Sequence, residues 1–223
     1  GVETEEGGRR QRQRVGPAPH DAPPSNAAIA AMGLAEAVAA LRTHVAVERV
    51  AEKACDRLAD LCRTIGAEQE QAAAEAGAIE AVVEVLRAHR QEPIVQGKGI
   101  AVLHEVCLCV DPAGWARAQR AAEAGFIEVV VVAMRTHVQD PDVQHLCLMA
   151  LIAVCDGDES SAGRARKQRA SVAGALEAVV EAMQAHPQEV NVQADGCEAL
   201  LSVCGRGASA AARARRQRAA QAG

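Results

Sequence analysis

The chain has 223 residues, of which 49% are hydrophobic and 1% are aromatic, and its formal net charge is -5. Such a chain holds enough apolar material for one large core or for several stacked repeats. Ala, Val and Leu supply most of it, whereas sandwiches and barrels draw on aromatic and β-branched residues between closely spaced turns, so we exclude sheet folds. The mild charge gives no global attraction to nucleic acid. No apolar run approaches the about 18 residues of a spanning helix, so we predict no membrane insertion.

The first 28 residues differ from the rest of the chain. Four arginines cluster there, at Arg9, Arg10, Arg12 and Arg14, and four prolines follow before residue 25. Large apolar side chains are almost missing, so burial cannot offset the entropy cost of ordering, and we predict a disordered basic, proline-rich tail over residues 1–28. The sequence starts at Gly1 without Met or an apolar signal core, which is typical of a processed product or of a piece of a longer protein.

A repeat organises residues 29–223. An Ala-Gly step ends at four glycines that are 48, 49 and 49 residues apart, namely Gly77, Gly125, Gly174 and Gly223. Four histidines are each followed 18 residues later by a cysteine, which pairs His44 with Cys62, His89 with Cys107, His137 with Cys155 and His186 with Cys204. Matched pairs at a fixed interval indicate tandem repeats. We therefore divide this part of the chain into units 34–77, 78–125, 126–174 and 175–223.

Each unit predicts three helices. An amphipathic run follows the Ala-Gly step and closes on the histidine, and a second apolar-periodic run, preceded in three units by Pro93, Pro141 or Pro187, leads to the cysteine. A shorter helix then returns to the next Ala-Gly step, whose glycine is free to adopt the left-handed conformation at the helix end. The last unit stops at Gly223, before any helices that could cover it, so we expect further repeats or a covering partner there.

The three helices resemble the armadillo repeat. The resemblance rests on residues 119–125 (QRAAEAG) for helix one, 174–180 (GALEAVV) for helix two and 198–204 (EALLSVC) for helix three. It implies an all-α, armadillo-like α-solenoid, a right-handed superhelix of three-helix repeats whose third helices line a concave groove. HEAT repeats have two helices and lack this Ala-Gly junction. Units of 48 or 49 residues exceed the about 40–47 usual for such repeats, and we expect the surplus to form an exposed loop before each first helix.

The cysteines do not predict a metal site or disulfides. Those paired with the histidines fall on the apolar face of the third helix and are expected to be small core residues. Equivalent helices pack about 8–10 Å apart, beyond the about 7 Å Cα separation that a disulfide spans, so the thiols indicate a reducing, intracellular compartment, cytoplasmic or organellar. The cluster His104, Glu105, Cys107 and Cys109 lies on one helix and offers two ligands to a zinc ion that needs four. We expect no metal and no cofactor.

The sequence contains no set of catalytic residues. It offers neither a Ser-His-Asp grouping outside the recurring repeat positions nor paired buried carboxylates, and the four repeated histidines are expected to satisfy carbonyls at helix ends. We therefore predict a non-catalytic scaffold for protein–protein interaction. The alternative is a fixed structural or peripheral subunit of a large assembly, possibly in an organelle.

Arginines recur on the first helix. One position holds Arg117, Arg166 and Arg215, and another holds Arg120, Arg169 and Arg218. This basic series is either a docking strip for the acidic surface of a partner protein or is paired with the glutamates that recur in the first turn of helix two, at Glu36, Glu80, Glu128 and Glu177. A nucleic-acid partner is not expected, because Trp115 alone cannot interleave aromatic rings with the basic residues.

The groove departs from the pattern of peptide-binding armadillo proteins. The resemblance places Asn at positions that hold Asp60, Glu105, Ala153 and Ser202 here, and Trp at positions that hold Asp56, Ala101, Met149 and Glu198. Without the asparagines the groove lacks a general clamp for a peptide backbone. We expect an acidic groove, with Asp60 and Glu105 as candidate binding residues, that holds basic peptides weakly and with strong salt dependence.

Overall fold

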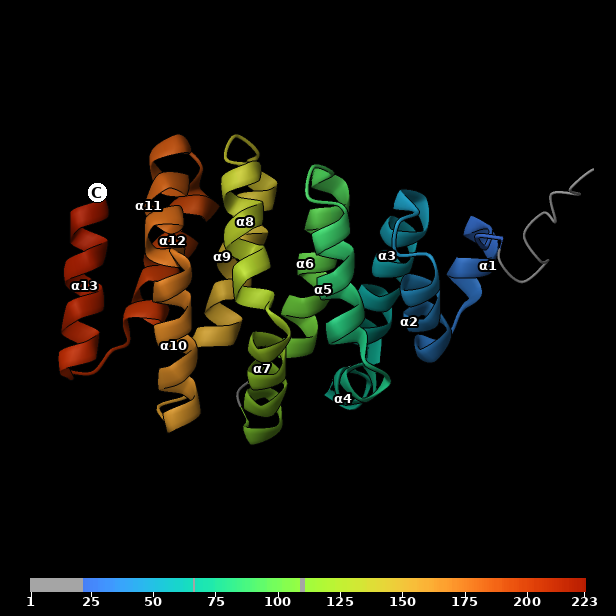
Figure 1. The fold of residues 1–223 in the computed structure, drawn as a ribbon, viewed down its shortest axis with the longest axis horizontal. Helices are drawn as coiled ribbons and strands as arrows, with labels where there is room; N and C mark the ends of the chain where they lie inside the picture. The colour runs from blue at the N-terminus through green and yellow to red at the C-terminus, as the bar shows by residue number, and fades with distance from the viewer. Residues whose placement is uncertain (1–21, 66, 109–110) are drawn as a thin grey trace, which may run out of the picture.

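The structure is a computed structural model, and it describes residues 22–65, 67–108 and 111–223. Those residues form thirteen α-helices and no β-strand, which confirms the predicted all-α class. Figure 1 shows the helices standing side by side in chain order along the long axis of the molecule. None of the described helices is long and apolar enough to cross a membrane.

The helices recur in a fixed order along the chain. After α1 (Asn26–Ala31), each unit contributes one second, one third and one first helix in that order. The second helices are α2 (Leu34–Thr43), α5 (Ala78–Ala88), α8 (Phe126–Thr136) and α11 (Ala175–Ala185). The third helices are α3 (Glu48–Ile65), α6 (Pro93–Cys107), α9 (Pro141–Cys155) and α12 (Val190–Cys204). The first helices are α4 (Ala67–Ala76), α7 (Pro112–Ala124), α10 (Ser161–Ala173) and α13 (Ala210–Ala222).

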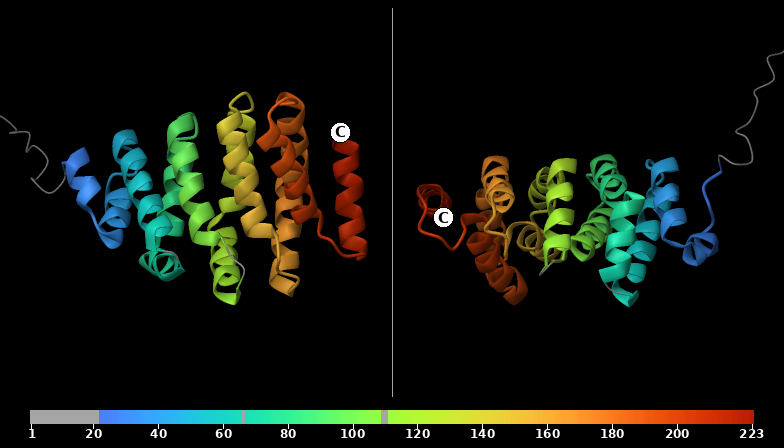
Figure 2. Two further views of the ribbon diagram at one scale, coloured as in Figure 1. Left: turned by 180° about the vertical axis from the view of Figure 1, so that it is seen from behind. Right: turned by 90° about the horizontal axis from the view of Figure 1, so that it is seen from below.

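Helices of one kind contact the next helix of the same kind. The third helices pack in the order α3, α6, α9, α12, and the second helices in the order α2, α5, α8, α11. In Figure 1 the second helices α5 and α8 lie in front of the third helices α6 and α9. Figure 2 shows the same helices from behind and from below. The buried side chains between these rows, mostly Ala, Val and Leu, form one continuous core. Small side chains suit helices packed this closely.

The Ala-Gly steps end the first helices as predicted. Gly125 and Gly174 have φ values of 95° and 90°, in the left-handed region that only glycine adopts freely. Each amide closes the preceding helix, since Gly125 N–H donates to the Ala122 carbonyl at 3.1 Å. The chain can then turn directly into the second helix of the next unit.

Helical structure begins before the predicted tail boundary at residue 28. Helix α1 starts at Asn26, the Ser25 hydroxyl caps it, and Ile29 is buried. Arg49 donates to the side-chain oxygen of Asn26 at 2.7 Å and to the Pro24 carbonyl at 2.8 Å. These contacts fasten the segment before α2 to α3. The four arginines of the predicted tail lie outside the described residues.

The first helices of the later units are longer than α4, so the expected exposed loop is found only in part, as the five-residue connections 156–160 and 205–209. Helices α7, α10 and α13 each have 13 residues, whereas α4 has 10. The earlier start follows from side-chain caps: the Ser160 hydroxyl accepts from Gly163 N–H at 3.2 Å, and Asp111 caps α7 in the same way. In the connection before α10 Asp158 is buried and Glu159 is exposed, whereas the connection before α13 is exposed from Arg206 to Ser209.

The repeated cysteines are core residues, as predicted. Cys62, Cys107, Cys155 and Cys204 are buried, and the seven cysteines among the described residues form no disulfide. Burial raises the pKa of the Cys62 thiol to about 11 and that of Cys155 to about 12. A thiol that is both covered and protonated does not react as a nucleophile.

We expect iodoacetamide to label Cys197 of the folded protein well before the buried thiols. Cys197 is exposed on α12, whereas Cys62 and Cys155 are covered and their thiols stay protonated. Peptide mapping by mass spectrometry after brief labelling gives the rate at each site. Labelling in denaturant should reach all eight cysteines of the sequence. Rapid modification of Cys155 in the native state would contradict its place in the core.

Candidate protein interaction surface

Three of the predicted docking arginines are buried inside the row of helices. Arg117, Arg166 and Arg215 are 6%, 2% and 6% exposed. Each donates through Nε to a carbonyl at the end of the third helix that precedes it, at Val106, Val154 and Cys204, over 2.6, 2.7 and 3.1 Å. These carbonyls have no partner within their own helix. The expectation that these three arginines form a docking strip is therefore wrong.

The same arginines also reach the preceding first helix. Arg117 forms an ion pair with Glu70 at 2.7 Å, and Arg166 donates to the side-chain oxygen of Gln119 at 3.3 Å. Arg166 additionally pairs with the buried carboxylate of Asp158 at 3.0 Å. The guanidinium groups thus join two neighbouring units, which is a structural role that the fork geometry of arginine suits.

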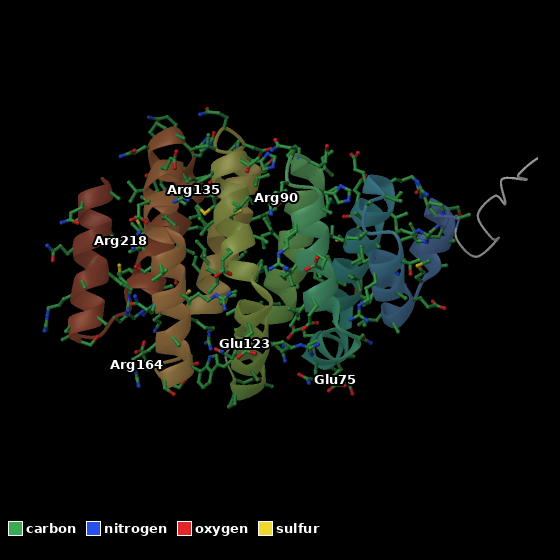
Figure 3. The ribbon with its side chains drawn as sticks, in the orientation of Figure 1. Glu75, Arg90, Glu123, Arg135, Arg164 and Arg218 are labelled. Atoms are coloured by element: carbon green, nitrogen blue, oxygen red, sulfur yellow. The ribbon has the colours of Figure 1, made fainter. Side chains whose placement is uncertain are left out.

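The second series of arginines pairs with glutamates, which is the alternative that the sequence left open. Arg120 binds Glu80 and Arg169 binds Glu128, both at 2.6 Å, and Arg218 binds Glu177 in the same way. Figure 3 labels Arg218 on α13, which packs against α11, the helix of Glu177. These pairs are about 40% exposed, so each is worth at most about 1 kcal/mol. Their positive charge is balanced within the chain.

We expect acid to weaken the fold through these pairs. Partial burial acts to raise the pKa of Glu80, but its hydrogen bond from Arg120 lowers that pKa below the usual value of 4.5, and the same balance applies to Glu177 with Arg218. Stability from a lowered carboxyl pKa is present above the unfolded value and is lost as pH falls through the folded value. Urea unfolding at about pH 6 and about pH 3 measures the loss. The loss should be smaller in Glu80→Gln, and an equal loss in this variant would contradict the assignment.

The repeated histidines hold the preceding unit. In three of the four, the ring Nε2 lies at hydrogen-bond distance from a carbonyl in the turn after the previous second helix: His89 from Val45 at 2.7 Å, His137 from Arg90 at 2.9 Å and His186 from Val138 at 2.7 Å. The predicted structural role is correct, but the carbonyl belongs to the neighbouring unit and not to the histidine's own helix.

A series of glutamines that bind helix ends was not predicted from the sequence. Gln96, Gln144 and Gln193 each donate from Nε2 to two carbonyls at the end of the second helix, over 2.8–3.0 Å. Each glutamine lies seven residues after the repeated histidine, and the first unit has Ala51 at this position. This fixed interval was the signal that could have found them.

Removing one of these glutamines should be costly where it is buried. Gln144 is 0% exposed and satisfies the carbonyls of Met134 and His137, so we expect Gln144→Ala to lower the free energy of unfolding by about 1–3 kcal/mol. The matched variant Gln193→Ala lies at a position that is only partly buried, where water replaces the donor, and should cost less. Equal losses in urea unfolding would show that burial does not set the effect.

The predicted acidic groove is partly neutralised at its first two units. Asp56 pairs with Lys98 at 2.6 Å, and Arg63 lies 3.6 Å from Asp60 and 3.8 Å from Glu105. Asp60 and Glu105 therefore share one arginine between α3 and α6. These two candidate binding residues do lie on neighbouring third helices, and the one arginine offsets part of their combined negative charge.

A hollow of ≈ 530 Å³ is lined by residues of the second, third and fourth units. Its lining comes from α6, α7, α9 and α12 and includes Trp115, Met149, Asp195 and Glu198. Asp195 bonds the His145 ring at 2.6 Å, which fixes the carboxylate. The indole Nε1 of Trp115 is buried and has no hydrogen-bond partner among the described residues. The hollow thus combines an aromatic ring, apolar side chains and carboxylates on one surface.

The described residues contain no group of three or more His, Cys, Asp or Glu placed to hold a metal ion. Comparison of the chain with protein-family models, with curated proteins and with solved structures finds no match. Function is therefore argued from the arrangement of the side chains alone.

Proposed function

We propose that the chain is a non-catalytic scaffold that binds a protein partner along its third helices. We further propose that its units form an armadillo-like, right-handed α-solenoid. The observation that carries the proposal is that α3, α6, α9 and α12 pack in one continuous row. Residues of α6, α9 and α12 also line the hollow at Trp115. A row of equivalent helices offers an extended surface, which suits a macromolecular partner better than a small substrate.

The polar contacts between units support this reading. Arg120 contacts Glu80, which lies 40 positions away in the chain, and His137 contacts the carbonyl of Arg90, which lies 47 positions away. Such contacts hold neighbouring units at a fixed spacing, so the row presents a preorganised surface to a partner. The repeated arginines of the first helices serve this internal purpose, so we propose the third helices as the binding face. The covered, unlinked thiols suit a reducing compartment inside the cell.

The second candidate, a fixed subunit of a large assembly, is favoured by one observation. Helix α12 exposes Val190 and Leu201 by 78% and 55%, and Cys197 is exposed beside a hollow of ≈ 580 Å³ that Leu200 and Leu201 line. Exposed apolar groups of this kind mark interaction sites. They would be covered permanently in a fixed assembly.

Affinity capture from the source cells, followed by native mass spectrometry, tests the two candidates. A scaffold should be recovered both alone and with a partner in defined stoichiometry, and its free form should stay monodisperse in size-exclusion chromatography. A fixed subunit should be recovered only in the assembly and should aggregate when separated from it. Recovery of the free form alone under gentle, low-salt conditions would contradict both candidates.

A further inference from the structure

We propose that the hollow at Trp115 receives a lysine or arginine side chain, so that the docking segment of the partner is basic. The inference rests on the proposed function, because it assumes that a protein binds the third-helix face. It adds the chemical class of the partner segment and the residues that select it.

Carboxylates from two units line the hollow. Asp156 follows α9, and Asp195 and Glu198 lie on α12. Glu198 is exposed and forms no ion pair with any described residue, and Asp156 lies 3.8 Å from the exposed Arg206. Asp195 is held by the His145 ring. The carboxylates therefore outnumber the cations around this hollow, in contrast to the balanced pairs at Asp56 and Lys98 on α3 and α6.

The apolar part of the lining suits a long cationic side chain. Trp115, Met149 and Ile152 line the same hollow. The methylene stem of a lysine or arginine packs on apolar side chains while its charged head stays near the carboxylates. A cation over an indole face gains about 0.5–1 kcal/mol at an exposed site. An acidic segment would meet repulsion here, and a purely apolar one would cover the carboxylates without satisfying them.

Trp115 provides a direct readout, because the chain has one Trp and no Tyr. The probe is a dodecapeptide of alternating arginine and alanine, and its control has citrulline, a neutral isostere, in place of arginine. We expect the arginine peptide to change the emission of Trp115 in a saturable way, with weaker binding at high salt. The lysine peptide should do the same, and the citrulline peptide should not.

Two variants locate the effect. Glu198→Gln should weaken binding of the arginine peptide about two- to fivefold, the range expected for one exposed ion pair. Glu181→Gln, an exposed position on α11 outside the hollow lining, is the matched control and should leave the affinity unchanged. Circular dichroism of both variants excludes loss of folding as the cause.

Three results would overturn the inference: an equal response to the citrulline peptide, a preference for a glutamate–alanine peptide, or no change in emission with the arginine peptide. Failure here is separable from failure of the proposed function. If a captured partner docks on the third helices through an acidic or apolar segment, the scaffold stands and the basic segment is wrong.

Discussion

Replacing Arg166 by methionine should lower the free energy of unfolding by about 3–5 kcal/mol, the usual loss when one partner of a buried ion pair is removed. The guanidinium group is 2% exposed and donates to the Val154 carbonyl, to Gln119 and to Asp158. Methionine fills much of the volume but donates to none of them. The Asp158 side chain, 4% exposed, is then left charged without its partner.

The pKa of Asp158 shows how closely this carboxylate depends on its surroundings. Burial acts to raise it, but hydrogen bonds from Ser160 and Arg166 and the charge of Arg166 hold it below the usual value of 3.8. Adding Asp158→Asn to Arg166→Met removes the unpaired charge and should restore part of the lost stability.

The control for Arg166 lies on the same helix. Arg164 is exposed at the start of α10, where Figure 3 labels it, and it donates to the exposed Glu159 carbonyl at 2.5 Å. Arg164→Met should change the free energy of unfolding by less than about 0.5 kcal/mol. Urea unfolding followed by circular dichroism measures all of these variants. A loss for Arg166→Met no larger than that for Arg164→Met would show that the buried arginine does not join the units.

A comparable loss is expected for Leu148→Ala on α9. Leu148 is 0% exposed, and truncating a buried leucine costs about 2–5 kcal/mol through lost burial and the cavity that remains. Cys197 occupies the corresponding place on α12, seven residues before the repeated cysteine, but it is exposed. Cys197→Ala should therefore change the free energy of unfolding by less than about 0.5 kcal/mol. Similar losses at both positions would contradict the packing of α12 over α9.

The helix ends and the buried cysteines could be predicted from the sequence, because their markers are local. The left-handed glycine at 125 follows from the end of one helix and the start of the next, and the burial of Cys155 follows from helical periodicity. The glutamate partners of Arg120, Arg169 and Arg218 could be named because the same spacing recurs in each unit.

The burial of Arg166 could not be read in this way. Arginine in an amphipathic helix is normally solvated, and its place here depends on the carbonyl of Val154 and on Gln119, which is 47 residues away. The hollow at Trp115 was also beyond the sequence, since its lining comes from four helices of three units. Such sites depend on how the units sit against one another, which spacing alone does not specify.

The central claim is that a protein partner docks on the third helices. Site-specific photocrosslinking tests it most directly, with p-benzoylphenylalanine placed at Met149 in the hollow or at Glu181 on α11. After irradiation in the source cells, mass spectrometry identifies the crosslinked peptides. We expect one partner to crosslink at position 149 through a segment rich in lysine or arginine, with little product at position 181. A partner that crosslinks at position 181 and not at position 149 would contradict the claim.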